Sequence, residues 1–365
     1  MKVSIKRDNL SKSLGMIGRM VKQRASLPVL SNIMLMTDRG RLKLVATDLE
    51  AACSEWIGAK IDEDGAITVP ARTLIDYVTT TTDDTLELVS SGADLNIKGS
   101  RHHATIKGIS AEEFPIIPQV KSDKVTKMKA IELKNAIFSV IIAAALDETR
   151  PVLAGILFRI IGSDLVLVAT DSYRLAEKRI KLNAPISQLD VVVPARTLSE
   201  VARILPADES IVEISSGENQ VQFRFSDTEF LSRQIDGAFP DYEQIIPKEF
   251  VLEADLSKAE FQEAIKMANV FARDAGGNIK VAASESGLVI SAISSQIGDA
   301  ENHVKATTKG SALTVAFNAK YILDALNVMN SDEMIFALSG PLNPGMIFDK
   351  NDGSFRYIVM PLRND

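Results

Sequence analysis

The sequence Ala-Thr-Asp occurs twice in this chain, and its aspartates are candidates for catalysis. Asp48 and Asp171 lie 123 positions apart, and each follows a predicted strand. A carboxylate at the end of a strand could serve in catalysis. An aspartate at this place also commonly caps the turn that follows the strand. We favour the capping role, because neither aspartate is accompanied by a nucleophile, a base or a set of metal ligands.

Other residues typical of catalysis or cofactor binding are scarce. Of the three histidines, His102 and His103 are adjacent, and neighbouring side chains on a strand point to opposite faces. The single cysteine, Cys53, permits neither an internal disulfide nor a cysteine metal cluster. The sequence has no phosphate-binding glycine loop, no dinucleotide fingerprint and no nucleophile elbow. We therefore predict that the protein is not an enzyme and uses no cofactor and no metal ion.

Basic residues give a stronger signal. Six Lys or Arg residues and one acidic residue lie in 6–24, and four Lys and one Glu lie in 124–134. Arg72 and Arg196 occupy equivalent places in two repeated segments, with Lys320 close to that place in a third. A solvated helix face would explain any one of them. Their recurrence in register favours a single basic stripe that attracts phosphate, with an affinity that falls as salt rises.

Internal repetition dominates the chain. The sequence of 42–48 returns at 165–171 with one substitution, and Pro-Ala-Arg-Thr-Leu at 70–74 returns at 194–198. A weaker third copy follows, so that three copies of about 120 residues, each near the size of one domain, account for the chain. The predicted domains are 1–122, 123–249 and 250–365.

Each copy is predicted to contain two helices among several strands. Apolar residues recur on one face over 9–22, which predicts the first helix. The second helix of a copy is predicted to start at Pro70 and Pro194, since proline fits the first turn of a helix. Helices separated by several hairpins favour an α+β fold with antiparallel sheets.

Composition sets further limits. The net charge of −7 argues against a general nucleic-acid coat and leaves room for one restricted basic surface. No apolar run approaches the roughly 20 residues that a membrane span requires, and the first residues lack a signal-peptide core. Together with the single cysteine, these features predict a cytoplasmic protein.

Three segments together resemble the bacterial DNA polymerase III beta subunit, the sliding clamp family. They are Ala-Thr-Asp-Ser-Tyr-Arg-Leu-Ala at 169–176, Phe-Pro-Asp-Tyr at 239–242 and Tyr-Ile-Val-Met-Pro-Leu-Arg at 357–363. The resemblance implies the DNA clamp fold, with three tandem similar domains that each pack two helices on antiparallel sheets. It also implies a head-to-tail homodimer that closes into a six-domain ring around double-stranded DNA, without sequence preference, and confers processivity on the replicative polymerase.

The family also binds short linear motifs. Its partners are the DNA polymerase III alpha subunit, the clamp loader, other DNA polymerases and repair proteins. The resemblance places the peptide-binding pocket between the second and third domains. Carried over by position, the pocket comprises Leu153, Thr170, Ser172, Tyr173, Arg174, Leu175, Pro240, Ile245, Asn318, Tyr321, Val359, Met360, Pro361, Leu362 and Arg363.

Candidate DNA contacts come from two sources. The resemblance implies that Arg24 occupies a DNA-contacting position and that Arg150 lies in a loop turned toward DNA. Charge placement adds Lys12, Arg72 and Arg196. Basic helices that cross the phosphate backbone would bind DNA without reading its sequence.

The resemblance also implies a dimer contact. Matched by position, Ala104 and Ile106 of the first domain would meet Val270 and Phe271 of the third domain of another chain. Pairing of edge strands would extend this apolar patch. Two alternatives to a DNA clamp remain at this point: a protein-only scaffold of the same fold that has lost DNA encirclement, and a hydrolase with a repeat architecture.

Overall fold

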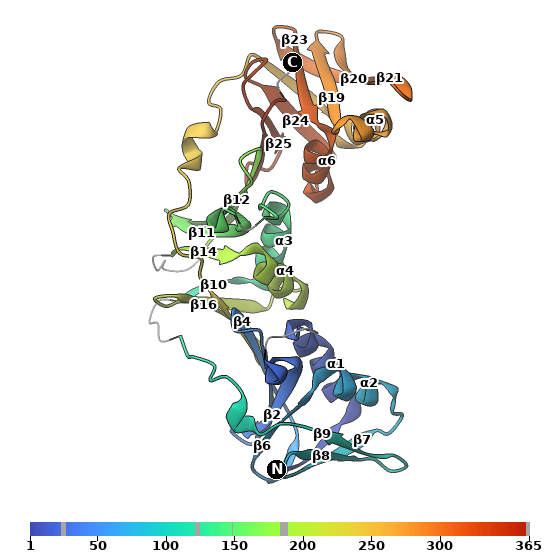
Figure 1. Cartoon of the computed structure of the whole chain (residues 1–365). Helices are drawn as coiled ribbons and strands as arrows, with labels where there is room; N and C mark the ends of the chain where they lie inside the picture. Colours follow the sequence, from blue (N-terminus) through green and yellow to red (C-terminus); the bar gives the residue numbers. More distant parts are fainter. Residues whose placement is uncertain (23–26, 121–124, 148, 183–188, 363–365) are drawn as a thin grey trace. The chain divides into compact units, whose positions relative to one another are not determined.

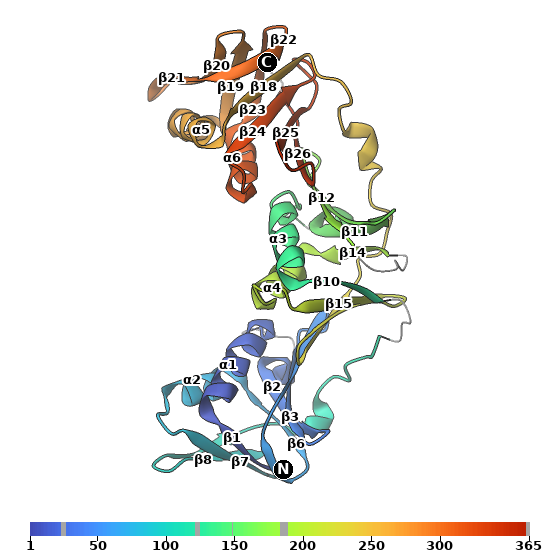
Figure 2. The same ribbon diagram turned by 180° about the vertical axis from the view of Figure 1, so that it is seen from behind.

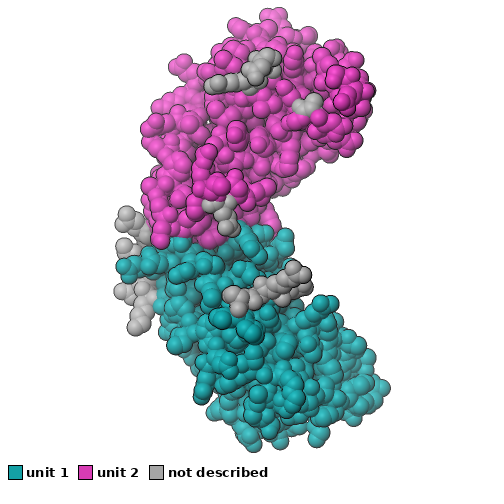
Figure 3. Space-filling view, in the orientation of Figure 1, with its two compact units in different colours: residues 1–134, 196–234 teal, residues 135–195, 235–365 magenta. Residues whose placement is uncertain are grey.

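The computed structural model describes residues 1–22, 27–120, 125–147, 149–182 and 189–362. These residues form two compact units, which Figure 3 colours separately. The first unit contains 1–134 and 196–234, and the second contains 135–195 and 235–365.

The two units do not coincide with the sequence repeats, because consecutive repeats share sheets. In the first unit, β17 of the second repeat pairs with β4 of the first, from Thr228 opposite Glu55 to Ser232 opposite Ala51. This pairing joins the two repeats into one sheet of eight strands. In order, they are β10 (Val125–Lys129), β15 (Ile211–Ser216), β16 (Gln220–Phe225), β17 (Thr228–Arg233), β4 (Ala51–Ile57), β3 (Arg41–Thr47), β2 (Asn32–Asp38) and β6 (Ala66–Pro70).

The first unit also holds a smaller sheet and three helices. The helices α1 (Arg7–Ile17), α2 (Ala71–Thr80) and α4 (Ala195–Ile204) lie on the same side of this unit in both views (Figures 1 and 2). Helix α3 (Ala130–Ile141) crosses the boundary between the units. The smaller sheet contains, in order, β5 (Lys60–Glu63), β1 (Lys2–Lys6), β7 (Thr85–Ser91), β8 (Asp94–Lys98) and β9 (His103–Lys107).

The second unit repeats the sharing of strands. Here β13 of the second repeat pairs with β26 of the third, with Arg174 opposite Val359. The resulting sheet has nine strands. In order, they are β14 (Asp190–Pro194), β11 (Gly155–Ile161), β12 (Asp164–Thr170), β13 (Arg174–Lys181), β26 (Phe355–Val359), β25 (Gly345–Asp349), β24 (Glu333–Leu338), β18 (Leu252–Ser257) and β22 (Ala306–Gly310).

Two helices and a further sheet complete the second unit. Helix α5 (Lys258–Ala272) is capped at its N-terminus by Ser257, whose hydroxyl accepts the N–H of Glu260, and α6 (Ala319–Val328) packs against α5. The sheet consists of β21 (Gly298–Val304), β20 (Gly287–Ser294), β19 (Asn278–Ser284) and β23 (Leu313–Asn318). Short 3₁₀ helices occur at η1 (Gly18–Met20), η2 (Pro28–Ser31), η3 (Ala111–Glu113), η4 (Pro151–Ala154), η5 (Tyr242–Ile245) and η6 (Arg273–Ala275).

The α+β prediction is confirmed, and all strand pairs in the described part of the chain are antiparallel. The first helix was predicted too long. It ends at Ile17, one 3₁₀ turn follows, and Val21 is extended. Leu10, Leu14 and Ile17 are already buried on one face of the shorter helix. The apolar spacing therefore did not require the helix to continue to Val21. Among the described residues, no helix combines the length and apolarity needed to cross a membrane.

Candidate functional site

The second Ala-Thr-Asp sequence forms a tight turn between β12 and β13. One carboxylate oxygen of Asp171 accepts the backbone N–H groups of Tyr173 and Arg174, at 2.9 and 3.0 Å. The hydroxyl of Thr170 donates to the carbonyl of Arg174 at 2.7 Å. Ser172, between them, adopts a left-handed backbone with φ of 77°. The capping interpretation of Asp171 fits this geometry, because its oxygens hold the turn.

The first Ala-Thr-Asp sequence forms the same turn in the other unit. Asp48 accepts the N–H groups of Glu50 and Ala51, and the hydroxyl of Thr47 donates to the carbonyl of Ala51. Burial of Asp48 opposes its ionisation, but the ammonium of Lys22 at 2.8 Å and the backbone donors lower the pKa of this carboxyl. Both aspartates therefore hold the turns that follow their strands.

Arg174 is the most constrained charged residue near the second turn. Its side chain is only 7% exposed. The guanidinium donates to Asp171 at 3.0 Å and to Asp324 of α6 at 2.6 Å. It also lies 4.4 Å above the ring of Tyr321, a cation–π contact. Although burial alone would lower the pKa of Arg174, neighbouring Tyr357 and the carboxylates raise it above the ordinary value, so the group stays charged.

The described C-terminal residues pass beside this cluster. The N–H of Met360 donates to the carbonyl of Tyr173, and the N–H of Leu362 donates to the carbonyl of Ala316, both at 2.8 Å. Sequence positions from the second and third repeats therefore meet in one place, as the family resemblance implied. Arg363 lies outside the described residues.

The remaining members of the predicted pocket differ in exposure. Tyr173 and Ile245 are exposed, at 61% and 42%, and Asn318 caps α6 by accepting the N–H of Lys320. Leu175, by contrast, has no exposed surface and packs in the core with Tyr242. On β13, Leu175 points to the opposite face from Arg174, toward this core. Leu153 and Thr170 are also buried, while Pro240 is exposed and Pro361 is partly exposed.

Arg150 lies beside the same turn. Its guanidinium donates to the hydroxyl of Ser172 at 3.0 Å. The preceding loop is held by Asp147, which accepts the N–H and the hydroxyl of Thr149. The structure thus brings a predicted DNA-facing arginine into contact with a predicted peptide-site serine, which the sequence did not indicate.

The other candidate DNA contacts lie on helices of the first unit. Lys12 on α1, Arg72 on α2 and Arg196 on α4 are all exposed. These three helices lie on one side of that unit (Figures 1 and 2). Arg24 lies outside the described residues.

The predicted dimer residues lie on or near sheet edges. Strand β9, which carries Ala104 and Ile106, is an edge of its sheet, and β21 is an edge of the sheet that α5 covers. Val270 is exposed on α5 and Phe271 is partly exposed, whereas Ile106 is buried within its own unit. Edge strands carry unpaired N–H and C=O groups that can accept another strand.

Sequence reasoning missed a buried polar anchor. Asp83 is almost fully buried, accepts the hydroxyl of Ser100 at 2.5 Å and lies 2.9 Å from the ring nitrogen Nδ1 of His102. It ties the β8–β9 hairpin to the end of α2. Within the described residues, no cluster of three or more His, Cys, Asp or Glu side chains could hold a metal ion.

Comparison with known proteins identifies the family. Family profiles of the DNA polymerase III beta subunit match the chain in three parts: the N-terminal domain at 1–118, the central domain at 127–241 and the C-terminal domain at 243–363. The chain belongs to the beta sliding clamp family. The beta sliding clamps of Staphylococcus aureus and Staphylococcus epidermidis are each 28% identical to it over 374 residues, covering 100% of this chain and 99% of theirs.

Solved structures agree with this membership. The sliding clamp of Bacillus subtilis superposes with a TM-score of 0.97 at 28% identity, and both chains are covered completely. A Pseudomonas aeruginosa sliding clamp bound to griselimycin superposes with a TM-score of 0.96, also at 28% identity and with full coverage of both chains. The clamp fold is therefore confirmed, and the chain is a sliding clamp of the DNA polymerase III type, a class of DNA replication proteins.

Proposed function

We propose that two copies of this chain close head to tail into a ring around double-stranded DNA and tether the replicative polymerase to it. The full-length similarity to sliding clamps carries this proposal. In this role the protein stays on DNA because a closed ring surrounds the duplex. It acts in the cytoplasm and catalyses no reaction. The proposal retains the three domains at 1–122, 123–249 and 250–365.

Attraction to DNA would come from the helical side. The chain carries a net charge of −7, yet Lys12, Arg72 and Arg196 are exposed on α1, α2 and α4. Lysine and arginine on helices that cross the backbone neutralise phosphates without contacting base edges, so the ring can move along any sequence. Binding at each phosphate can be weak, because a closed ring leaves circular DNA only by opening. Arg24 and Arg150 complete the proposed set.

Ring closure would use two of the sheet edges, β9 and β21. We assign β9 of one copy and β21 of the next to a continuous pairing, with Ala104 placed near Val270 and Phe271. Ile106 would support the strand from inside, since it is 5% exposed. A head-to-tail contact of this kind closes after a fixed number of units or continues as a filament. Three domains per chain would close after two copies.

Partner recruitment would use a proposed peptide cleft in the second unit, beside the turn at Asp171 and the C-terminal residues. Tyr173, Ile245, Met360 and Leu362 offer adaptable apolar contacts to a leucine or aromatic anchor of a partner peptide. We infer that Arg174 holds the cleft in shape instead of contacting the peptide, because two carboxylates already occupy its guanidinium. The proposed partners are the polymerase III alpha subunit, the clamp loader, other DNA polymerases and repair proteins.

Primer extension tests this function. On a singly primed circular template with excess unprimed competitor, the replicative polymerase should make markedly longer products per binding event when the clamp and its loader are present. A variant without residues 360–365 should form the same two-chain particle by light scattering but give short products. Product lengths that do not depend on the clamp would refute the proposal.

A further inference from the structure

The first unit contains a cleft that the family resemblance did not predict. It is a cavity of about 320 Å³ near the start of β4 and the end of β17. This size is at the low end of the range for ligand pockets. Its lining includes Leu49, Glu50, Ala51, Ile116, Leu231 and Arg233.

The cleft lies at the place that the internal repeat makes equivalent to the proposed peptide cleft of the second unit. The turn at Asp48 forms the hydrogen bonds of the turn at Asp171, and Leu49 has φ of 74° where Ser172 has 77°. On the strands that follow, Ala51 opposite Ser232 corresponds to Arg174 opposite Val359. The same backbone frame therefore occurs in both units.

A proline-containing segment completes both frames. In the first unit, Phe114 is buried and Pro115, Ile116 and Pro118 line the cavity. In the second unit, the repeated Phe-Pro pair falls at 239–240, and Pro240 belongs to the proposed peptide cleft. Ile116 is 94% exposed, which is unusual for so large an apolar side chain.

Three substitutions give the two clefts different chemistry. Ala51 stands in the first unit where the second unit has Arg174. A methyl group therefore takes the place of a long side chain at the cavity. Leu49 replaces Ser172 and adds an apolar wall. Glu50 replaces Tyr173, and its carboxylate lies 3.5 Å from the guanidinium of Arg233, with both side chains about 60% exposed. Among the described residues that line the cavity, these two alone are charged.

We propose that this cleft is a second docking site, which takes a short extended peptide with two leucine-sized side chains and a carboxylate between them. Alternate side chains of an extended peptide point the same way, so two leucines would enter between Leu49, Ile116 and Leu231. The intervening carboxylate would face the mouth, where Arg233 has N–H donors beyond its single long contact with Glu50. This site extends the proposed function, because its peptide chemistry is argued from the likeness to the cleft of the second unit.

Methyl NMR can observe both clefts at once. The protein is labelled at isoleucine and methionine methyl groups, so Ile117 reports on the first-unit cleft and Met360 on the second-unit cleft. The probe is the blocked peptide Gly-Leu-Asp-Leu-Gly, with Gly-Ser-Asp-Ser-Gly and Gly-Leu-Lys-Leu-Gly as controls. We expect the Ile117 signal to shift saturably with the first peptide, with a Kd below about 1 mM, and about threefold to fivefold more weakly with the lysine peptide.

Variants test whether the cleft itself binds. Ile116→Lys should weaken the Ile117 response about tenfold while leaving that of Met360 unchanged, and Arg233→Glu should reverse the preference between the aspartate and lysine peptides. Ile211→Lys is the matched control, since Ile211 is an exposed isoleucine of the same unit that does not line the cavity. It should leave both responses unchanged.

The outcomes separate this proposal from the proposed function. A shift of Met360 without a shift of Ile117 would overturn the second site and leave the first peptide cleft standing. A shift of Ile117 alone would support the second site and count against the cleft at Met360. A shift of neither signal would overturn the second site. A shift of Ile117 that appears on concentrating the protein without peptide would assign the cleft to another copy of the chain, and would also overturn the proposal.

Discussion

Arg150 donates a hydrogen bond of 3.0 Å to the hydroxyl of Ser172, 22 positions later in the chain. The arginine belongs to the loop proposed to face DNA, and the serine belongs to the turn proposed to border the peptide cleft. Ser172 adopts a left-handed backbone that is uncommon for a residue with a side chain. The loop that carries Arg150 and the turn at Ser172 are therefore in direct contact within one unit.

This contact predicts coupling between Arg150 and Ser172 in peptide binding. Arg150→Ala and Ser172→Ala should each modestly weaken the binding of a polymerase-tail peptide. The double variant should bind the peptide no more weakly than whichever single variant binds it less tightly. A hydrogen bond to an exposed guanidinium is worth about 1 kcal/mol or less, which limits each change to about fivefold. Titration calorimetry of the four proteins measures the coupling. Additive losses would show that the two residues act independently.

Arg174 should be the most important ion-pairing residue for stability in the second unit. Arg174→Leu leaves the carboxylates of Asp171 and Asp324 without their buried partner, so unfolding should become easier by about 3 kcal/mol. Lys320→Ala is a suitable control, because Lys320 contacts the same Asp324 at 2.6 Å but is 68% exposed. This control should cost less than about 1 kcal/mol. Urea denaturation measures both, and equal losses would contradict the account.

Asp83 should make the first unit sensitive to acid. Hydrogen bonds from Ser100 and His102 lower the pKa of Asp83 in the folded state. A lowered pKa means that its contribution to stability is full above the unfolded value of about 3.9 and is lost as pH falls below it. Asp83→Asn should therefore be less stable than the natural chain at pH 7, with a gap that narrows below about pH 4. Urea midpoints across this range measure the gap, and parallel curves would rule out the assignment.

The helix residues should govern the salt dependence of DNA binding. Replacing Lys12, Arg72 and Arg196 singly with alanine should each lower the slope of log affinity against log salt by up to about 0.9, the value for one lost phosphate contact. Lys60→Ala, an exposed lysine on β5 of the same unit, should leave the slope unchanged. Fluorescence anisotropy with short duplexes gives the slopes. If Lys60→Ala lowered the salt slope by the same amount, the three helix residues would have no special role in DNA binding.

The repeat predicted local structure well and predicted connections between repeats poorly. The turns at Asp48 and Asp171 followed from a strand end and an aspartate, both visible in the sequence. The pairing of β4 with β17, and of β13 with β26, joins segments far apart in the chain, and alternation of side chains along a strand does not indicate its partner.

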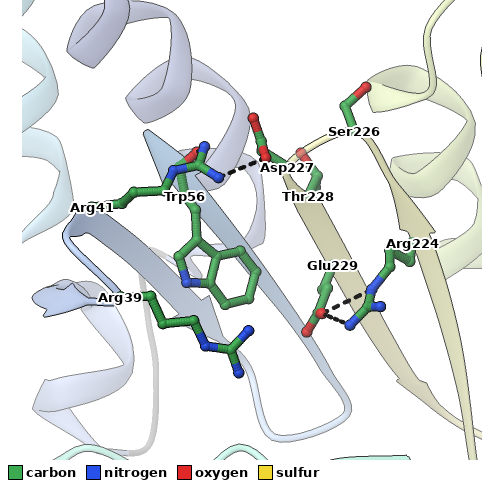
Figure 4. A pocket seen from close by; sticks show the side chains of 8 residues that line it. All are labelled: Arg39, Arg41, Trp56, Arg224, Ser226, Asp227, Thr228 and Glu229. Atoms are coloured by element: carbon green, nitrogen blue, oxygen red, sulfur yellow. Dashed lines mark hydrogen bonds and ion pairs between the residues drawn. The ribbon is translucent and has the colours of Figure 1, made fainter. Parts of the chain in front are cut away.

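Ion pairs between residues far apart in the chain could not be predicted from the sequence either. Arg174 pairs with Asp324, which lies 150 positions later. In the first unit, Arg41 pairs with Asp227 at 2.7 Å and contacts the carbonyl of Trp56, linking two repeats beside a polar pocket of about 260 Å³ (Figure 4). Neither pair shows a motif, because ion pairs require proximity and no fixed spacing. Burial of Leu175 was missed because the resemblance transferred positions and not side-chain directions.

Linearising the DNA tests the central claim of encirclement most directly. The clamp is placed on a circular duplex with a single restriction site, unbound protein is removed, and retention is followed at moderate salt before and after cutting. A ring that encircles DNA should remain on the circle and leave within the time needed to slide off the new ends, and blocking both ends with bulky protein should restore retention. Equal retention on circular and linear DNA would contradict encirclement and favour a scaffold that binds proteins alone.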